Sequence, residues 1–394
     1  MSNREVVILS GVRTAIGDYG GSLKDKPTTE LASAVVREAV SRAKVDPKDV
    51  GQVVFGNVIH TDRRDMYISR VAAIQGGLPI ETAAYTLNRL CGSGLQSIVN
   101  AAQCIALGDV TAAVAGGVES MSRGQYWMPG LRWGQRMNDG QVVDAMVGAL
   151  TDPFDDCHMG VTAENIAEKW GISREDQDAL AVLSHQRAAA ATANGNFKDQ
   201  ILPIELVTRK GTTIFDKDEH IRGDITVEAL AKLKPVFNKQ GSVTPGNASG
   251  INDAAAAVVL MDRAAADKQG LKPMARFVAY AHSGVEPKYM GIGPVPAIKA
   301  VLEKANLTIA DMDVIELNEA FAAQALAVVR DLNLPMDKVN PNGSGISLGH
   351  PIGATGTIVT VKALYELQRT GGRYALISMC IGGGQGIAAI IERL

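Results

Sequence analysis

The two ends of this 394-residue chain carry the same succession of sequence landmarks. Each has a short β-branched run, an Ala-rich amphipathic stretch, a second apolar run that ends near asparagine, a Gly-flanked helical run and a final apolar run before glycines. They occupy residues 6–9, 30–43, 53–55, 91–107 and 112–115 in the first copy, and 277–280, 296–305, 314–317, 350–367 and 374–378 in the second. Because these landmarks keep their order, and the last three of them a similar spacing, a duplicated α/β unit explains them better than ordinary α/β alternation.

A region of different character separates the two copies, from about Met121 to Gly250. It holds all three tryptophans, mixes acidic with basic residues and has few runs with the two-residue period of strands. We interpret it as an insertion into the first copy that caps a site. The expected division is an N-terminal half of residues 1–120 and 250–271, an inserted loop domain of residues 121–249 and a C-terminal half of residues 272–394.

The composition excludes several classes of partner. A net charge of −3 without any block of like charges argues against nucleic acid. The longest purely apolar stretch, residues 254–261, is too short to cross a bilayer, and the first residues lack the long apolar segment of a secretion signal. Four cysteines are too few for a disulfide framework in so long a chain, so we expect a reducing, cytoplasmic setting and no membrane partner.

A cysteine lies in the sequence Asn88-Arg-Leu-Cys91-Gly-Ser-Gly94, between a predicted strand and a predicted helix. Backbone N–H groups and the dipole at a helix start favour a thiolate, and the glycines let a ligand approach the chain. Cys91 is therefore a candidate nucleophile. The motif alone leaves open the alternative of a small buried cysteine.

The matching position of the second copy carries a histidine, in Gly349-His350-Pro-Ile-Gly353. If a twofold axis relates the two copies, the starts of their matched helices face each other. His350 is then within reach of Cys91 and can take its proton. A structural role for a histidine on a Gly-rich turn is the alternative.

The last predicted strand runs into Met379-Cys380-Ile-Gly382-Gly-Gly-Gln-Gly386. This loop supplies a second cysteine, and its N–H groups have the character of an oxyanion hole for a thioester carbonyl. A nucleotide-binding loop is the rival interpretation, but the glycine spacing is not G-x-G-x-x-G and no helical pattern of useful length follows.

Two further motifs have more than one interpretation. Asn318 and Glu319 follow the middle strand of the second copy, where Asn318 could hold a water or donate to an oxyanion and Glu319 could orient His350. A helix cap followed by a first-turn acid explains the same pair. Cys157-His158 in the insertion lacks the spacing of a metal site, so we expect no metal and favour a ligand contact by His158.

Seven motifs together resemble those of the thiolase family, in order and along essentially the whole chain: NRLCGSG, GGVESMS, HMGVTAEN, GNASGIND, NEAF, NPNGSGISLGHPIGATG and MCIGGGQG. The agreement is strongest with bacterial β-ketothiolases that make or cleave short 3-ketoacyl-CoA esters, including those of polyhydroxyalkanoate synthesis. The resemblance implies an α/β thiolase fold, in which duplicated βαβαβαββ halves form a five-layered αβαβα sandwich. It also implies that the inserted loop domain binds coenzyme A.

The resemblance further implies roles for individual residues. Cys91 is the acylated nucleophile, and His350 activates it and shares an oxyanion hole with a water held by Asn318. Cys380 moves the α-proton of acetyl-CoA, and the N–H groups of Cys91 and Gly382 form a second oxyanion hole. The residues implied to line the coenzyme A and acyl site are His158, Met159, Arg222, Phe237, Ser249, Met290, Ala320 and Phe321.

The implied enzyme is an acetyl-CoA C-acetyltransferase or C-acyltransferase. It condenses acetyl-CoA with a short acyl-CoA to give a 3-ketoacyl-CoA, and it runs the coenzyme A-dependent thiolysis in reverse. An acyl-cysteine predicts ping-pong kinetics, and donors aimed at a thioester oxygen activate the carbonyl. Coenzyme A thioesters are substrates in this scheme, and no cofactor is expected.

Two departures from the family pattern bear on substrate binding. Pro245 stands where many relatives have alanine beside the pantetheine, which puts that coenzyme A contact in question. The run Asn342-Gly343-Ser344-Gly345 replaces the common N-G-G-A of biosynthetic acetoacetyl-CoA thiolases, which leaves room for a priming substrate other than acetyl-CoA.

Two other functions share parts of this pattern. A non-catalytic acyl-CoA or lipid binder on the same fold would not need both cysteines and the histidine. A carrier-protein-dependent ketoacyl synthase would favour a Cys-His-His or Cys-His-Asn set and a basic docking patch.

For the assembly, large apolar residues in the segment 123–146 and the resemblance predict a homotetramer built as a dimer of dimers. A reversible disulfide between Cys91 and Cys380 is a further hypothesis.

Overall fold

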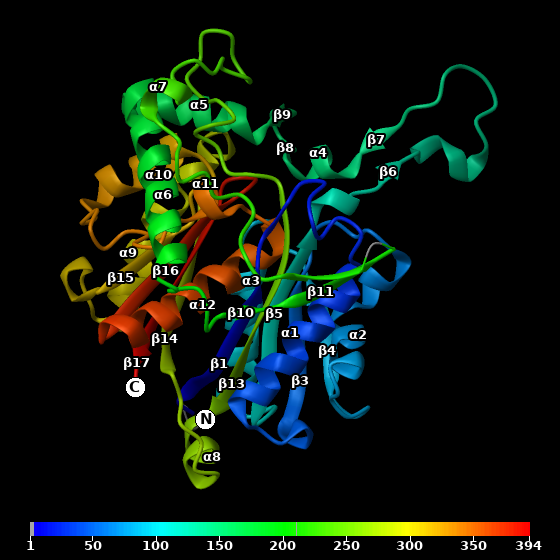
Figure 1. Ribbon diagram of the computed structural model, residues 1–394, viewed down its shortest axis with the longest axis vertical. Coiled ribbons are helices and arrows are strands. Elements are labelled where there is room, and N and C mark those ends of the chain that lie inside the picture. The colour runs from blue at the N-terminus through cyan, green and yellow to red at the C-terminus, as the bar shows by residue number, and fades with distance from the viewer. Residues whose placement is uncertain (1–3, 210) are drawn as a thin grey trace.

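Residues 4–209 and 211–394 are described by the computed structural model, which is built around a mixed β-sheet (Figure 1). Its N-terminal part has the strand order β4-β3-β5-β13-β1. These strands are β1 (Val6–Thr14), β3 (Val50–Gly56), β4 (Ala83–Leu87), β5 (Ala112–Ser120) and β13 (Asn252–Asp262). Strand β3 is parallel to β4 and β5, whereas β13 is antiparallel to β5 and β1.

The C-terminal part of the sheet repeats this arrangement in the order β15-β16-β17-β14. The strands are β14 (Ala275–Gly284), β15 (Val314–Leu317), β16 (Tyr374–Ile381) and β17 (Gln385–Arg393). Strand β15 is parallel to β16 and to a bridge at Val339, and β17 is antiparallel to β16 and β14. Strand order and direction therefore confirm the predicted duplication. The two parts join through a short antiparallel contact of β1 with β14.

Helices form layers outside and between the two parts of the sheet. The central layer is α3 (Ser93–Leu107) and α12 (Ile352–Thr370), which share one apolar core with strands of both parts. Helices α1 (Thr28–Ala43) and α2 (Ile68–Gln75) cover one outer face, and α9 (Pro294–Ala305) and α10 (Ala322–Leu332) cover the other (Figure 1). The layers follow the expected αβαβα order.

Glycines let the two central helices meet near their N-termini. A Cβ on Gly94 would lie 2.7 Å from the backbone nitrogen of Thr357, and a Cβ on Gly356 would lie 2.1 Å from that of Leu95. Real Cβ atoms do not approach backbone so closely, so both positions need glycine. The close crossing places the turns that precede α3 and α12 beside each other.

The apolar composition of α3 follows from its place in the core. Among the described residues, Leu90–Leu107 is the one helical segment long and apolar enough to cross a membrane. Its side chains pack on α12 and on strands of both sheet parts. Burial inside the protein accounts for the composition of this helix.

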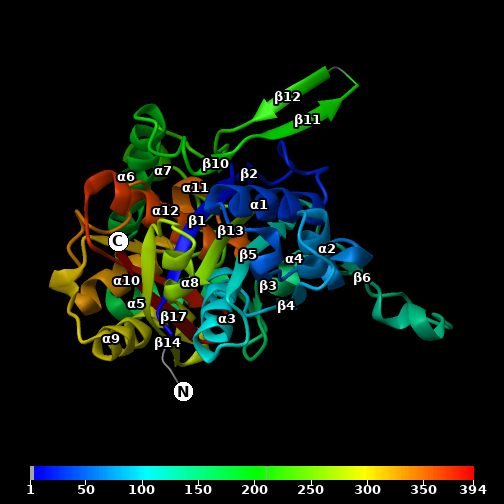
Figure 2. The same cartoon turned by 90° about the horizontal axis from the view of Figure 1, so that it is seen from below.

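The insertion leaves the sheet after β5 and returns at β13. Its helix α5 (Met159–Trp170) packs against α10 and the 3-10 turn η5 (Pro287–Ile292) of the C-terminal half. An arm that contains β6 and β7 (Figure 1) and the hairpin β11–β12 (Figure 2) project from the body. The helices and strands of the insertion are β6 (Tyr126–Trp127), β7 (Val143–Asp144), α4 (Ala145–Ala149), β8 (Thr151–Asp152), β9 (Cys157–His158), α5 (Met159–Trp170), α6 (Arg174–Ala193), β10 (Ile201–Leu202), β11 (Ile204–Thr208), β12 (Gly211–Phe215) and α7 (Val227–Leu230).

Some boundaries differ from the sequence prediction. Helix α3 begins at Ser93 after the cap Gly92, and α12 begins at Ile352 after the extended Pro351, so neither Cys91 nor His350 opens a helix. Strand β17, which follows the glycine turn, was not among the predicted strands. The remaining short elements are β2 (Gly17–Asp18), α8 (Arg263–Lys268), α11 (Gly345–Leu348), η1 (Pro47–Asp49), η2 (Arg63–Tyr67), η3 (Met121–Arg123), η4 (Pro129–Trp133), η5 (Pro287–Ile292) and η6 (Ile309–Asp311).

Candidate active site

A cavity of about 340 Å³ lies where the turns before α3 and α12 meet the insertion and the β16–β17 turn. We call it the central cavity. Four predicted catalytic residues line it: Cys91, His350, Cys380 and Gly382. Asn318 lies behind the lining, with its Nδ2 3.5 Å from Nε2 of His350. The structure therefore brings these residues together from both halves, while their individual roles stay predictions.

Cys91 occupies a tight turn between β4 and α3. Leu90, directly before it, has a φ of +47°, in the left-handed region that leucine rarely adopts. The N–H of Leu90 donates to Oδ1 of Asn88 at 2.8 Å, and its carbonyl accepts the hydroxyl of Ser93 at 2.7 Å. These local bonds hold the strained turn that presents Cys91 to the cavity.

Burial decides the protonation state of the Cys91 thiol. It raises the pKa of the thiol to about 11, and the charge of Glu119 acts in the same direction. The backbone N–H groups of Gly382 and of Cys91 itself point at the sulfur and oppose this rise. The expectation of a thiolate stabilised by the helix start is therefore wrong, because desolvation of the charged form outweighs the N–H groups. At neutral pH the thiol keeps its proton and needs a base.

His350 has the properties of that base. Burial lowers its pKa to about 4, so the imidazole is neutral at neutral pH. Thr355 Oγ1 lies 2.7 Å from Nδ1 and donates its own proton to the carbonyl of Pro351 at 3.0 Å. This network assigns the proton to Nδ1 and leaves Nε2 as the acceptor. The backbone N–H of His350 donates to Oδ1 of Asn252 at 2.9 Å.

The acid that follows Asn318 has a different role from the one expected. Glu319 accepts bonds from the Ser184 hydroxyl at 2.6 Å and from Nδ2 of Asn340 at 2.9 Å, so the hypothesis that it orients His350 is wrong. Asn340 also bonds both backbone groups of Leu317, at 2.9 and 2.8 Å. These contacts fix the end of β15 that carries Asn318. Asn318 and Glu319 are not a helix cap, because the residue at the N-cap position of α10 is Phe321.

Cys380 lies near the end of β16 and is almost fully buried. Burial raises the pKa of its thiol far above the ordinary value, and the neighbouring Cys91 raises it further. All four cysteines are free thiols in this structure. A thiol of such high pKa becomes a strong base when it loses its proton, which suits proton transfer better than nucleophilic attack.

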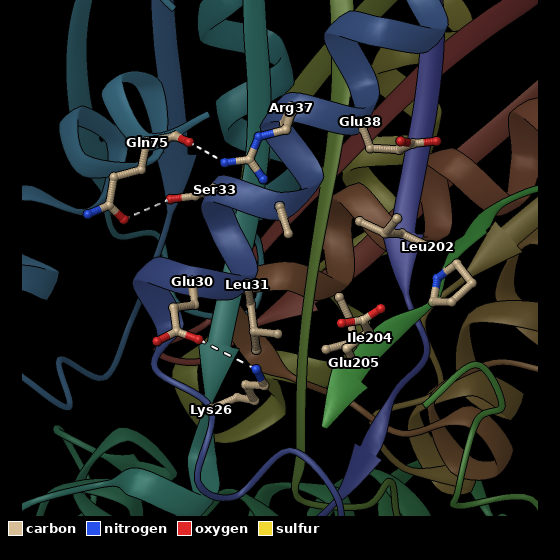
Figure 3. Close-up of a pocket in the computed structure, with 12 residues that line it drawn as sticks. Lys26, Glu30, Leu31, Ser33, Arg37, Glu38, Gln75, Leu202, Ile204 and Glu205 are labelled. Atoms are coloured by element: carbon tan, nitrogen blue, oxygen red, sulfur yellow. Dashed lines mark hydrogen bonds and ion pairs between the residues drawn. The ribbon is translucent and has the colours of Figure 1, made fainter. Parts of the chain in front are cut away.

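A second cavity, of about 440 Å³, lies between α1 and the start of the β11 strand (Figure 3). Its charged side chains are largely paired: Lys26 meets Glu30 at 3.6 Å, and Arg37 donates to the carbonyl of Gln75. The described residues that line it include neither cysteine nor histidine. It therefore lacks the nucleophile and base that the central cavity combines.

Comparison with protein families agrees with the chemistry of the central cavity. The family of the thiolase N-terminal domain matches residues 6–264, and that of the thiolase C-terminal domain matches residues 271–393. The chain belongs to the thiolase family.

Relatives match this thiolase along its whole length. It is 64% identical to "Beta-ketothiolase BktB" of Cupriavidus necator over 99% of the chain and 100% of the relative. It is 49% identical to an acetyl-CoA acetyltransferase of Syntrophomonas wolfei over 99% and 100% of the two chains. The human mitochondrial 3-ketoacyl-CoA thiolase superposes with a TM-score of 0.98 at 46% identity, covering 100% of both chains. A structure of that human enzyme in complex with CoA gives 0.96 at 45% identity, covering 100% and 99%.

One wall of the thiolase cavity is aromatic. The rings of His158 and Phe237 stack with centroids 4.7 Å apart, and Phe237 meets Phe321 edge-on at 6.5 Å. Nδ1 of His158 accepts the N–H of Gly160 at 3.0 Å, which caps α5 and puts the imidazole proton on Nε2. Burial lowers the pKa of His158, so the ring is a flat, neutral surface beside the cavity.

The other predicted binding residues also line the cavity, with one exception. Ser249 donates its N–H to the carbonyl of Ala320 at 2.9 Å, and Met159 and Met290 also line the cavity. Arg222 is exposed and outside the lining; its backbone N–H donates to Nδ1 of His185 at 3.1 Å.

The two departures from the family pattern occupy different places. Pro245 lines the cavity. Ser344 lies behind it and donates its hydroxyl to the carbonyl of Leu317 at 3.2 Å, so it touches the support of Asn318 rather than the cavity itself.

Two buried residues of the site were missed by the sequence analysis. Asn252 holds the backbone of His350, and Glu119 bonds the N–H of Gly353 near the start of α12 at 2.8 Å. Both lie within motifs of the resemblance, GNASGIND and GGVESMS. An acid at the end of an otherwise apolar strand was the available signal for Glu119, because a buried carboxylate needs specific partners. Within residues 4–209 and 211–394, no group of three or more His, Cys, Asp or Glu has the arrangement of a metal site.

Proposed function

We propose that this thiolase catalyses the reversible Claisen condensation of acetyl-CoA with a short acyl-CoA to a 3-ketoacyl-CoA, and the coenzyme A-dependent thiolysis in reverse. The observation that carries the proposal is the meeting of Cys91, a neutral His350 and Cys380 at one cavity. A binder of acyl-CoA without catalysis would not need this set. The family membership and the named relatives support the same reaction.

The first half-reaction acylates Cys91. Nε2 of His350 takes the thiol proton, and the sulfur adds to the thioester carbonyl carbon. The tetrahedral intermediate then expels the thiolate of coenzyme A, which leaves with the proton held by His350. Because the first product leaves before the second substrate reacts, the kinetics are ping-pong.

The second half-reaction forms the carbon–carbon bond. Cys380 first gives its thiol proton to Nε2 of His350, and its thiolate then removes the α-proton of acetyl-CoA. The resulting carbanion attacks the carbonyl carbon of acyl-Cys91. The carbon–sulfur bond then breaks, the sulfur of Cys91 takes the proton from His350, and Cys380 keeps the α-proton as a thiol. We assign the N–H groups of Cys91 and Gly382 to one oxyanion hole, and His350 with a water held by Asn318 to the other.

The substrate-binding roles follow the walls of the cavity. We assign His158, Met159, Phe237 and Met290, with Ser249, Ala320 and Phe321, to the pantetheine and acyl contacts, and Arg222 to the outer part of coenzyme A. No step in this scheme is given to a metal or a nicotinamide. We retain the division into residues 1–120 with 250–271, 121–249 and 272–394, with coenzyme A binding and assembly placed in the middle segment.

The assembly and setting are part of the same proposal. Trp133 and Met137 on the arm are 86% and 81% exposed, more apolar surface than a free loop normally presents. We propose that the arm joins two dimers into a homotetramer, and that the enzyme works in the cytoplasm on short acyl-CoA esters, including those of polyhydroxyalkanoate synthesis. Light scattering tests the assembly, and a mass near 41.5 kDa at micromolar concentration contradicts it.

A thiolysis assay tests the activity. Acetoacetyl-CoA and coenzyme A should yield acetyl-CoA, whereas a non-catalytic binder gives none. A requirement for an acyl carrier protein would favour a ketoacyl synthase instead. A series of 3-ketoacyl-CoA esters from C4 to C8 then defines the chain length, and replacing Pro245 with Ala should change the KM for coenzyme A more than kcat.

A further inference from the structure

Glu119 and Cys380 occupy equivalent positions in the two halves. The paired ends of β3 and β5 are Gly56 and Gly117, and those of β15 and β16 are Leu317 and Ser378. Two residues further along, the N-terminal half has Glu119 where the C-terminal half has Cys380. One residue after the neighbouring strand, it likewise has Asn57 where the other half has Asn318. The fold thus brings a second polar pair to the same end of the sheet.

The Glu119 carboxylate is fully buried and accepts four hydrogen bonds. Oε1 accepts from Nδ2 of Asn57 at 3.1 Å and from the N–H of Ile59 at 3.0 Å. Oε2 accepts from the N–H of Val58 at 3.1 Å and from the N–H of Gly353 at 2.8 Å. The first three donors belong to the loop after β3, and the fourth belongs to α12. One carboxylate therefore bonds an N-terminal loop to a C-terminal helix.

The bond to α12 is a close backbone approach. A Cβ on Gly353 would lie 2.5 Å from Oε2, so the contact requires glycine. Gly353 is the second residue of α12, where backbone N–H groups have no partner inside the helix. It lies three residues after His350. Any movement of this helix start relative to the N-terminal half shifts the imidazole relative to Cys91.

We propose that Glu119 is a positioning residue of the thiolase reaction, which holds the start of α12, and with it His350, against the half that carries Cys91. Glu119 does not line the central cavity, so it acts through another residue rather than on the substrate. This inference rests on the roles proposed above for Cys91 and His350.

Replacing Glu119 with Gln tests the clamp with little change in volume. The amide NH2 would face two of the N–H donors and could accept from neither, so one side of the clamp is lost. We expect kcat for acetoacetyl-CoA thiolysis to fall at least about tenfold, as for other displaced catalytic groups. The KM values should stay within about twofold, because no substrate contact is changed.

Asp65 provides a matched control. It is also a fully buried carboxylate of the N-terminal half, and it accepts bonds from Thr28, Thr61 and Asp62 but none from α12. Asp65→Asn should lower the melting temperature while leaving kcat of the folded enzyme within about twofold, since only bonds within the N-terminal half are lost. Equal loss of kcat in both variants would mean that any buried acid matters equally, which would overturn the proposal.

The rate of Cys91 alkylation by iodoacetamide, followed against pH, gives a readout that stability does not move. Cys380 from β16 and His350 before α12 share the cavity with Cys91, the charge of Glu119 from β5 acts on the Cys91 thiol from behind the lining, and the charge of Asp65 from η2 acts on Glu119. Burial raises the pKa of Glu119 to about 8, so the group carries a negative charge at the more alkaline midpoint of Cys91, where it opposes the thiolate. Glu119→Gln removes this charge, so the alkylation midpoint should move to lower pH by roughly 0.5–1 unit. Glu119→Asp keeps the charge, and its midpoint should remain near that of the parent.

Gly353→Ala tests the position of the start of α12 without removing the charge of Glu119. It also provides a second test of the proposal if Glu119→Gln does not fold. Its methyl group pushes the carboxylate off α12 but leaves the charge, so kcat should fall while the alkylation midpoint stays. Normal kcat in folded Gly353→Ala or Glu119→Gln protein would overturn the proposal. If the parent enzyme fails to cleave acetoacetyl-CoA, the proposed function fails, and the alkylation profiles still decide whether Glu119 faces Cys91.

Discussion

Residues 121–251 connect β5 to β13 in the N-terminal half, whereas residues 382–384 connect the equivalent strands β16 and β17 in the C-terminal half. The strands on either side have the same directions and neighbours in both halves. One topology therefore carries a long insertion in one copy and a minimal turn in the other. The insertion supplies cavity walls such as the stacked His158 and Phe237.

The short turn supplies a positioned backbone instead of a surface. Gly383 and Gly384 have φ values of +79° and +83°, which other residues rarely adopt. They turn the chain at once after Gly382, whose N–H points at the Cys91 sulfur. The two connections therefore have different functions. The long one forms walls of the substrate-binding cavity, and the short one positions a single backbone N–H donor.

The largest expected effect comes from the nucleophile in the N-terminal copy. Cys91→Ser should lower turnover by roughly three orders of magnitude or more, because a serine alcohol is far less acidic than even a thiol of raised pKa. Mass spectrometry after brief exposure to acetyl-CoA should find no acetyl group on the variant. Substantial turnover would show that Cys91 is not the nucleophile. The comparison of Cys91 with His350 as a matched nucleophile and base would then fail.

The matching change in the C-terminal copy should separate two chemical steps. Cys380→Ser should leave Cys91 able to take an acetyl group from acetyl-CoA. Condensation and thiolysis should fall by about 10²–10⁴-fold, because no group of suitable pKa remains to move the α-proton. The acetylated cysteine is detected by mass spectrometry and turnover by a coupled assay. Normal turnover would mean that another base acts, with His350 as the first suspect.

The short turn should tolerate a side chain less well than the arm does. A Cβ on Gly384 would lie 2.3 Å from the carbonyl of Val285, so Gly384→Ala should cost about 1–3 kcal/mol and lower kcat as Gly382 moves. Gly134 in the arm has a similar φ of +79° with open space around it, and Gly134→Ala is the matched control. Thermal melts and kcat compare the two. Equal effects would show that strain alone, and not the crowded turn, limits this connection.

The pH dependence of acylation should reflect the neutral base of the C-terminal copy. The pKa of His350 is about 4, below its ordinary 6.5, so the fraction of neutral imidazole is constant above about pH 5 and falls as the pH drops through 4. The rate of Cys91 acetylation should therefore show no acidic limb between pH 5 and 7. Quenched-flow measurements with mass spectrometry test this, and a limb centred near 6.5 would place His350 in a more solvated site.

The smallest effect is expected behind the site. Ser344→Gly removes a hydroxyl that donates to the carbonyl of Leu317, yet Nδ2 of Asn340 still donates to that oxygen. Stability should change by no more than about 1 kcal/mol and kcat by no more than about twofold. The ratio of activities on C4 and C5 3-ketoacyl-CoA should not change. A changed ratio would give this residue the part in substrate choice that its place outside the cavity argues against.

The fold and the main residues of the site could be predicted from the sequence, but the environment of those residues could not. Repeated landmarks predicted the matched halves, because strand and helix periods are local properties of the chain. The protonation state of Cys91 was missed, because desolvation depends on residues distant in sequence. His350 bonds Thr355 and not Glu319, which instead accepts a bond from Ser184. The sequence offers both residues as partners of His350, and only the tertiary packing decides which of them reaches the imidazole. The place of Arg222 outside the cavity depends on the path of the insertion, which has no counterpart in the other copy.

The crossing of α3 and α12 at Gly94 and Gly356 has a consequence for how such a site can arise. Two identical units packed about a symmetry axis would place the same residue before both helices, so a sulfur would face a sulfur or an imidazole an imidazole. A nucleophile facing its own base requires units of different sequence. Either half alone carries one partner of the reaction and lacks the other. Covalent fusion of the two units keeps the unlike residues at fixed stoichiometry, and no encounter between separate chains is needed to assemble the pair.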